Sequence, residues 1–144
     1  MGEDWREVNA VWHGDLGFIG SNSAGSEVQM GTVAGEPGVT PMELLLLGLA
    51  GCTGMDVASI LLKMRQKLVD FKINVRGKRA DDHPKIYTEI EVTFELWGDD
   101  LDPSAVQAAI ELSEVKYCSA SAMLRTAAQI RSKYLIHQLT QEVI

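Results

Sequence analysis

Hydrophobic and polar residues alternate most regularly in the middle of the chain, in two runs at residues 71–76 and 86–97. The residues that share one face are Phe71, Ile73 and Val75 in the first run and Ile86, Thr88, Ile90, Val92, Phe94 and Leu96 in the second. A period of two residues is typical of strands with one buried and one solvated face. The segment from Ala80 to Pro84 separates the runs, so we expect an antiparallel hairpin.

A different pattern precedes this hairpin and predicts a long helix from Met42 to about Lys67. Thr40, Pro41 and Glu43 occupy the positions of N-cap, first and third helical residues in a capping box. The stretch from Leu44 to Ala50 is apolar on every side of such a helix. We therefore expect this helix to be central and buried.

The remaining elements are shorter. We expect strands at 5–12, 18–20 and 27–32, a turn at 21–25 and a loop at 35–39 in the first forty residues. After the hairpin we expect helices from Pro103, capped by Asp102, to about Lys116 and from Ser119 to Arg131, and a last strand from Tyr134 to Leu139. This order predicts one α+β domain spanning residues 1–144 rather than an alternating βαβ fold.

Composition narrows the class of protein. The 144 residues suit a single domain, and 46% apolar with 23% charged residues is typical of globular chains. A net charge of −7 argues against nucleic acid and anionic membranes as partners. Charged residues and glycines interrupt the apolar segment 42–64, and the polar, acidic start is unlike a signal peptide. We expect a cytoplasmic protein whose two cysteines stay reduced.

Cys52 lies inside the long predicted helix and is surrounded by Gly48, Gly51 and Gly54. Each glycine costs about 1 kcal/mol in a helix relative to alanine. Two explanations remain open for this cost: another helix or chain packs closely over the glycines, or they leave room for a substrate beside the thiol. Burial as a small apolar side chain is the alternative to any chemical role.

Cys118 is placed at the start of the third predicted helix, where the helix dipole favours the reactive thiolate. Packing in the core is again the alternative. Asp56 and Glu114 lie one turn from the two cysteines; because a nearby carboxylate raises a thiol pKa, we interpret both as surface or packing residues. The three histidines lie in separate segments without metal-ligand spacing, so we expect neither a metal nor another cofactor.

The segments Thr40-Pro-Met-Glu-Leu-Leu-Leu-Leu-Gly-Leu-Ala-Gly-Cys52 and Ser113-Glu-Val-Lys-Tyr-Cys118 resemble the OsmC/Ohr superfamily. Ala-Gly-Cys-Thr-Gly-Met-Asp-Val and Lys-Tyr-Cys-Ser are most similar to its less characterised OsmC-like branch. The resemblance implies an α+β OsmC-like fold with antiparallel sheets wrapped around a long central cysteine-bearing helix. It also implies an intertwined homodimer.

The resemblance further implies a thiol peroxidase that protects against oxidative stress. Cys52 would reduce an organic hydroperoxide and become a sulfenic acid, and Cys118 would condense with it to a disulfide. An external dithiol, a lipoyl group in characterised members, would restore both thiols. The resemblance makes Glu43 a site residue that pairs with an arginine. Arg6 is the only lysine or arginine before the helix and does not match that position, so Arg79 or a basic residue of the partner chain is the candidate replacement.

Two other functions stay open on the same fold. One is a protein that binds a small apolar ligand or fatty acid between the glycine-rich helix and the hairpin. The other is a redox sensor or disulfide-exchange protein that reacts with thiols rather than peroxides. The peroxidase hypothesis requires that Cys52 and Cys118, 66 residues apart, come within disulfide reach.

Overall fold

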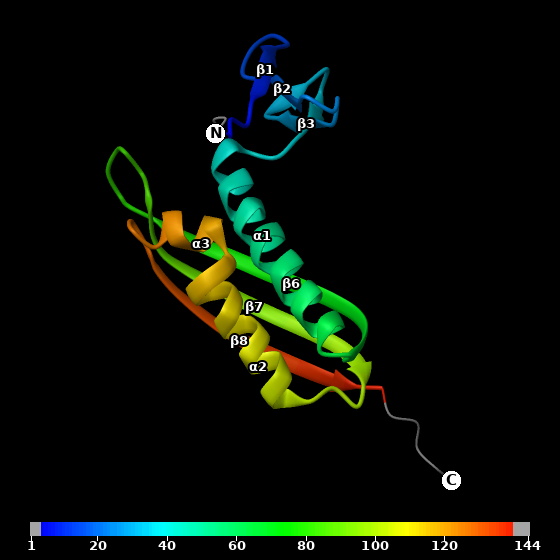
Figure 1. Ribbon diagram of the computed structural model, residues 1–144. Helices are drawn as coiled ribbons and strands as arrows, with labels where there is room; N and C mark the ends of the chain where they lie inside the picture. Colours follow the sequence, from blue (N-terminus) through cyan, green and yellow to red (C-terminus); the bar gives the residue numbers. More distant parts are fainter. Residues whose placement is uncertain (1–3, 140–144) are drawn as a thin grey trace. The chain divides into compact units, whose positions relative to one another are not determined.

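A computed structural model describes residues 4–139 of the chain. These residues form two compact units, an N-terminal unit up to Leu45 and a C-terminal unit from Leu46 onward. Helix α1 (Pro41–Lys63) begins in the first unit and continues into the second (Figure 1). Each unit is described separately below.

The N-terminal unit is built from five strands. β1 (Val8–Trp12), β2 (Phe18–Asn22) and β3 (Glu27–Met30) form an antiparallel sheet in chain order, and β4 (Thr32–Val33) pairs with β5 (Glu36–Pro37). The first three confirm the predicted strands, but β5 falls in the segment predicted as loop. Ala34 and Gly35 have φ angles of +52° and +81°, which is the conformation of a two-residue hairpin turn. Alanine at the first turn position hides this signal in the sequence.

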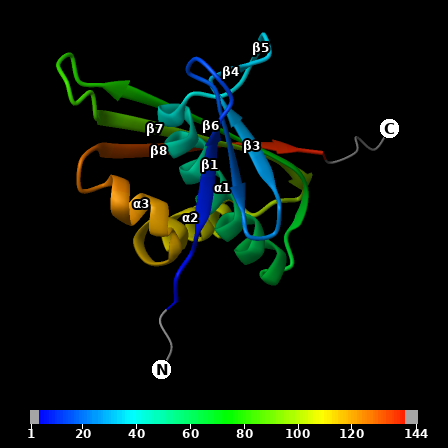
Figure 2. The same cartoon turned by 90° about the horizontal axis from the view of Figure 1, so that it is seen from above.

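The C-terminal unit has a three-stranded sheet in the order β6-β7-β8. β6 (Lys67–Arg79) and β7 (Tyr87–Asp99) form the predicted antiparallel hairpin, and β8 (Gln129–Gln138) pairs parallel to β7. α2 (Pro103–Leu112), α3 (Ser119–Leu124) and the C-terminal part of α1 lie against the same face of this sheet (Figures 1 and 2). The opposite face carries charged side chains, including the ion pairs Arg76–Glu91, Lys78–Glu89 and Arg131–Glu89.

The hydrophobic core fills the space between this sheet and its helices. Its large, fully buried side chains come from α1 (Leu49, Val57 and Leu61), from β7 (Ile90, Phe94 and Leu96), from the segment before α2 (Leu101) and from α2 itself (Val106). The rings of Phe71 and Phe94 stack with centroids 6.3 Å apart across the hairpin. The buried stripe Leu49, Thr53, Val57 and Leu61 follows helical spacing and confirms the long helix. The helix is buried on one side only, since Leu45 and Leu47 are exposed in this chain where burial on all sides was predicted.

Helix α1 ends at Lys63 rather than near Lys67 as predicted. Arg65 adopts φ +58°, the amide of Gln66 donates to the carbonyl of Leu61, and that of Arg65 donates to Leu62. These two bonds form a Schellman motif, which ends a helix through one left-handed residue. Glycine usually occupies that residue, so arginine there concealed the helix end.

The third predicted helix is also shorter than expected. α3 ends at Leu124 instead of Arg131, and β8 begins at Gln129 instead of Tyr134. Ile130, Tyr134 and Ile136 are half-buried at even positions of β8, so the period-two pattern prevails over the helical spacing that we assigned there. α2 ends at Leu112 and is followed by a π-helical turn, η1 (Ser113–Tyr117), where a continuous helix to about Lys116 was predicted.

The inward face of β7 agrees with the predicted alternation from Ile90 to Leu96 but not at its start. Tyr87 is buried, whereas Ile86 and Thr88 are exposed. The register shifts between Lys78 and Arg79, whose partners are Glu89 and Tyr87. This irregularity reverses the faces because side chains alternate strictly along a strand.

Among the described residues, α1 is the one helix long and apolar enough, by length and composition, to cross a membrane. Core helices of soluble proteins meet the same criterion. Here one side of α1 packs in the core through Leu49, Val57 and Leu61.

Candidate functional site

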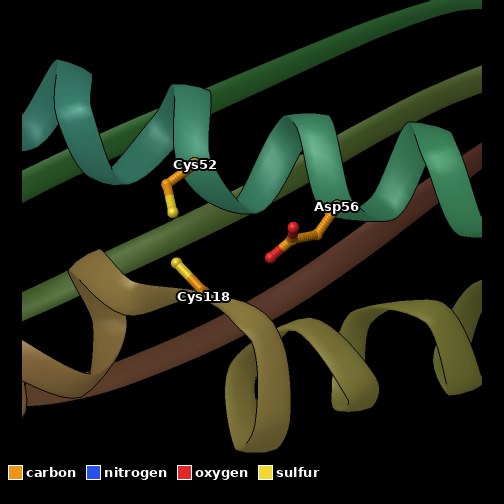
Figure 3. Close-up of side chains that lie close together, drawn as sticks. All are labelled: Cys52, Asp56 and Cys118. Atoms are coloured by element: carbon orange, nitrogen blue, oxygen red, sulfur yellow. The ribbon is translucent and has the colours of Figure 1, made fainter. Parts of the chain in front are cut away.

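The two cysteines converge in the C-terminal unit. The sulfurs of Cys52 and Cys118 and a carboxylate oxygen of Asp56 all lie within 4.8 Å of one another (Figure 3). Cys52 and Asp56 project from successive turns of α1, and Cys118 comes from the junction between η1 and α3. Both cysteines are free thiols. The fold thus joins two residues that are 66 positions apart.

The neighbouring glycines of Cys52 have different surroundings. A methyl group at Gly54 would lie 2.6 Å from Cδ1 of Ile73, so the end of this β6 side chain occupies the space that the glycine leaves on α1. This neighbour is a strand side chain, whereas the sequence pattern had suggested another helix or chain, or room for a substrate. Gly48 and Gly51 are exposed, with no atom within 4 Å of a methyl group at either position. Within this unit, Cys52 itself is half-buried on the side of α1 that faces Cys118 (Figure 3).

The π-helical turn places Cys118. Its backbone amide donates to the carbonyl of Ser113 at 2.7 Å, and its backbone is then extended, with φ −76° and ψ 103°. Cys118 is the N-cap of α3, as predicted, and its sulfur accepts a hydrogen bond from the Ser121 amide at 3.3 Å. Only 3% of the residue is exposed. The resulting thiol is held by both the turn and the cap.

A hydrogen-bonded chain of three side chains supports this cluster. The hydroxyls of Thr53 and Ser113 are 2.8 Å apart, and the Ser113 hydroxyl donates to Asp56 at 3.0 Å. Thr53 and Ser113 are buried and Asp56 is half-buried. The interpretation of Asp56 as a surface or packing residue agrees with its half-buried position and its contact with Ser113, but it did not foresee that Asp56 lies beside both sulfurs. Its spacing of four residues from Cys52, which places both on one helix face, is the signal that could have identified it.

The electrostatic environment of Cys118 also differs from the prediction. Burial raises the pKa of the Cys118 thiol above its ordinary value, and the hydrogen bond from Ser121 opposes this shift only in part. The neighbouring Cys52 thiol raises this pKa further. The expected stabilisation of a thiolate by the short α3 helix is therefore outweighed by the loss of hydration.

Glu43 has the predicted capping geometry. Its carboxylate accepts from the Thr40 amide at 2.8 Å, and its own amide donates to the Thr40 hydroxyl at 3.1 Å. This reciprocal pair confirms the capping box and accounts for Glu43 in the N-terminal unit. Arg6 pairs with Asp4, and Arg79 donates to the carbonyl of Lys85 in the hairpin. Neither contact involves the carboxylate of Glu43.

The arrangement of the two sulfurs permits disulfide formation. A disulfide joins two sulfurs about 2.05 Å apart, and the sulfurs of Cys52 and Cys118 already lie within 4.8 Å of one another. Cys52 is half-buried and Cys118 is buried, so Cys52 is the more accessible of the two sulfurs. The site can therefore pass from one oxidised sulfur to a disulfide without long-range movement of the chain.

Comparisons with known proteins agree with this fold. The family model described as OsmC-like protein matches residues 34–133. Protein YhfA of Escherichia coli K12 is 37% identical over 128 residues, covering 89% of this chain and 96% of YhfA. A hypothetical protein from Aquifex aeolicus VF5 has a crystal structure with TM-score 0.85 and 35% identity, covering 97% of this chain and 100% of that one. The organic hydroperoxide resistance protein OhrB of Bacillus subtilis shares the fold, with TM-score 0.62, 20% identity and coverage of 92% and 98%.

Proposed function

The chain belongs to the OsmC-like protein family, and on that basis we propose that it is a thiol peroxidase that reduces organic hydroperoxides. The observation that carries this proposal is the convergence of the Cys52 and Cys118 sulfurs within 4.8 Å. Structural neighbours described as organic hydroperoxide resistance proteins support the substrate class and a role in oxidative stress. Cys52 is the peroxidatic residue and Cys118 the resolving residue of this proposal.

In the first step, the Cys52 thiolate attacks one oxygen of the hydroperoxide and the O–O bond breaks. The leaving alkoxide takes up a proton and departs as the alcohol, while Cys52 becomes a sulfenic acid. Cys52 serves this step because it is the more accessible of the two thiols. Sulfur is oxidised by two electrons and the peroxide is reduced by two, so no further reactant is needed.

In the second step, the Cys118 sulfur attacks the Cys52 sulfenic acid. The S–S bond forms, the S–O bond breaks, and the hydroxyl leaves as water with the proton of the Cys118 thiol. Burial of Cys118 protects it from direct oxidation before Cys52 has reacted. A dithiol then reduces the disulfide by exchange, and we assign a dithiol such as a lipoyl group as the reductant.

Glu43 is retained in the proposal as a site residue, together with its observed capping role. The resemblance to the OsmC/Ohr superfamily implies that the glutamate at this position pairs with an arginine that stabilises the peroxidatic thiolate. Arg79 or a basic residue of a second copy is the proposed replacement for that arginine. Without such a cation the thiolate is less favoured and the peroxidase is slower.

A homodimer is part of the proposed function. One face of α1 exposes Leu47, Met55 and Leu62 by 54%, 77% and 62%, with the exposed Gly51 between them. These positions follow helical spacing, so they form one apolar stripe that a second copy can cover. Small residues in the stripe let two helices approach closely. We place this dimer in the cytoplasm, where reductants keep both thiols reduced.

Turnover tests the proposal. The reduced protein is supplied with dihydrolipoamide and either cumene hydroperoxide or hydrogen peroxide, and peroxide loss is followed. We expect catalytic consumption that is faster with the organic peroxide and absent in Cys52→Ser. A reaction no faster than that of free cysteine would contradict the proposal. Ligand binding that survives in Cys52→Ser would then favour the apolar-ligand alternative, and faster reaction with glutathione disulfide than with peroxide would favour the disulfide-exchange alternative.

A further inference from the structure

The cysteine pair has a third neighbour that the peroxidase steps do not use. A carboxylate oxygen of Asp56 lies within 4.8 Å of both sulfurs, so three atoms that can bind a metal ion form one cluster (Figure 3). We propose that Cys52, Cys118 and Asp56 form a binding site for a thiophilic divalent cation of the zinc class. The site goes beyond the proposed function, because binding of a cation requires no peroxide chemistry.

The geometry is close to that of a tetrahedral zinc centre. Zinc–sulfur bonds of about 2.3 Å and zinc–oxygen bonds of about 2.1 Å place ligand atoms about 3.6–3.8 Å apart. The three atoms here are within 4.8 Å of one another, so they have to approach by at most about 1.2 Å. Three protein ligands leave the fourth position to water, as in many zinc sites.

Neighbouring groups already orient the ligands. Asp56 accepts a hydrogen bond from Ser113 at 3.0 Å, and Ser113 is fixed in turn by Thr53 at 2.8 Å. The Ser121 amide holds the Cys118 sulfur at 3.3 Å. Outer contacts of this kind commonly fix metal ligands, and their loss weakens binding by roughly 10- to 100-fold. The site is therefore supported on α1, η1 and α3 rather than on a loose surface.

Charge favours a cation at this point. In the ion pairs found over residues 4–139, the acidic partners are Asp4, Glu89, Glu91, Glu95 and Asp99, so Asp56 is joined to no lysine, arginine or histidine there. Two thiols that release their protons to water and one carboxylate supply three negative charges, and a divalent cation offsets two of them. Thiolate ligands select zinc or cadmium over magnesium or calcium.

The cation and the disulfide exclude each other, since both need the two sulfur atoms. A bound cation would hold the thiols reduced and out of reach of hydroperoxide. This consequence rests on the proposed peroxidase activity, whereas the binding of the cation does not rest on it. Loss of metal binding and loss of peroxidase activity can therefore be observed separately.

Cadmium is the probe for the test, because sulfur-to-cadmium charge transfer gives an ultraviolet absorption band. The full chain, reduced with a phosphine, is titrated with Cd²⁺ and then with Zn²⁺ in competition. We expect one cation per chain and a charge-transfer band that is weaker in Cys52→Ser and in Cys118→Ser. Asp56→Asn keeps an acceptor for Ser113 and should bind at least tenfold more weakly. Asp82→Asn, at an exposed turn, is the matched control and should bind like the wild type.

Three results would overturn the inference: no charge-transfer band in the wild type, equal affinity in Asp56→Asn and wild type, or binding that persists after the Cys52–Cys118 disulfide has formed. Thermal unfolding of each cation-free variant shows whether it is folded. If Asp56→Asn is unfolded, Asp56→Ser replaces it in the same titration. A peroxidase assay on the same cation-free samples decides the proposed function independently of these readings.

Discussion

The two cysteines occupy regions of opposite character. Cys52 lies in the middle of a regular 23-residue helix, half-buried, with exposed glycines on the adjoining face. Cys118 lies where the regular helix geometry fails, between a π-helical turn and a six-residue helix, and is buried. One region makes a thiol accessible, whereas the other makes a thiol fixed and hidden. The difference suits an ordered reaction in which Cys52 reacts with the oxidant and Cys118 reacts only with Cys52.

The largest expected effect separates the two roles directly. Cys52→Ser should abolish hydroperoxide reduction, because the nucleophile is lost. Cys118→Ser should keep one rapid equivalent of peroxide reduction and then accumulate a sulfenic acid at Cys52, since no resolving thiol follows. Trapping with dimedone and intact mass measure both results. If both variants failed to reduce the first equivalent of peroxide, the assignment of separate roles to Cys52 and Cys118 would be contradicted.

The glycines near Cys52 allow a second comparison. Gly54→Ala should show little or none of the gain of about 1 kcal/mol that helix propensity offers, because its methyl group would meet Cδ1 of Ile73 at 2.6 Å and that side chain has to rotate away. Gly51→Ala meets no atom within 4 Å and should be neutral or raise stability by up to about 1 kcal/mol through helix propensity. Urea unfolding measures both at several protein concentrations. A cost for Gly51→Ala that appears only at dimer-forming concentrations would locate the interface at this face.

Alkylation of the reduced protein compares the two thiols without peroxide. Iodoacetamide should modify Cys52 at least tenfold faster than Cys118, because Cys118 is 3% exposed and its burial raises its pKa. Peptide mapping over time gives both rates in one sample. Comparable rates in the folded protein would show that Cys118 is accessible, and unfolding in urea should make them equal.

The smallest effect concerns the helix that leads to Cys118. Hydrogen bonds from Ser104 to the side chain of Asp102 lower the pKa of this α2 N-cap, so the ionised form is favoured in the folded state. Its stabilising contribution is therefore present above the ordinary aspartate pKa of about 3.9 and is lost as pH falls through the lower folded value. Asp102→Asn keeps a capping oxygen without titrating. Its melting temperature should fall slightly less than that of the wild type between pH 5 and about 3.

Much of the fold could be read from the sequence because local signals were strong. The capping box at Thr40 begins α1 and the N-cap at Asp102 begins α2, as predicted. Strict alternation from Ile90 to Leu96 defines the buried face of the sheet. The predictions failed at turns where another residue takes the place of the glycine or asparagine that usually marks them. Arg65 ends α1 where glycine is common, and Ala34 occupies a hairpin turn.

The site was only partly predictable, for reasons of distance. Sequence patterns placed Cys52 on a helix and Cys118 at a helix start, and the family resemblance paired them. Nothing local showed that Ser113 would link Thr53 to Asp56, because that chain of contacts spans 57 to 60 residues. The net pKa direction of Cys118 likewise depends on burial, which only the tertiary structure determines.

The central claim is that Cys52 and Cys118 form one redox unit. Its most direct test is one equivalent of cumene hydroperoxide added to the reduced, reductant-free and metal-free protein, followed by intact mass and non-reducing peptide mapping. The account predicts rapid loss of two hydrogens and a peptide pair linked through Cys52 and Cys118. Thiols that survive as long as free cysteine, or a Cys52 oxidised beyond sulfenic acid with Cys118 still free, would contradict it.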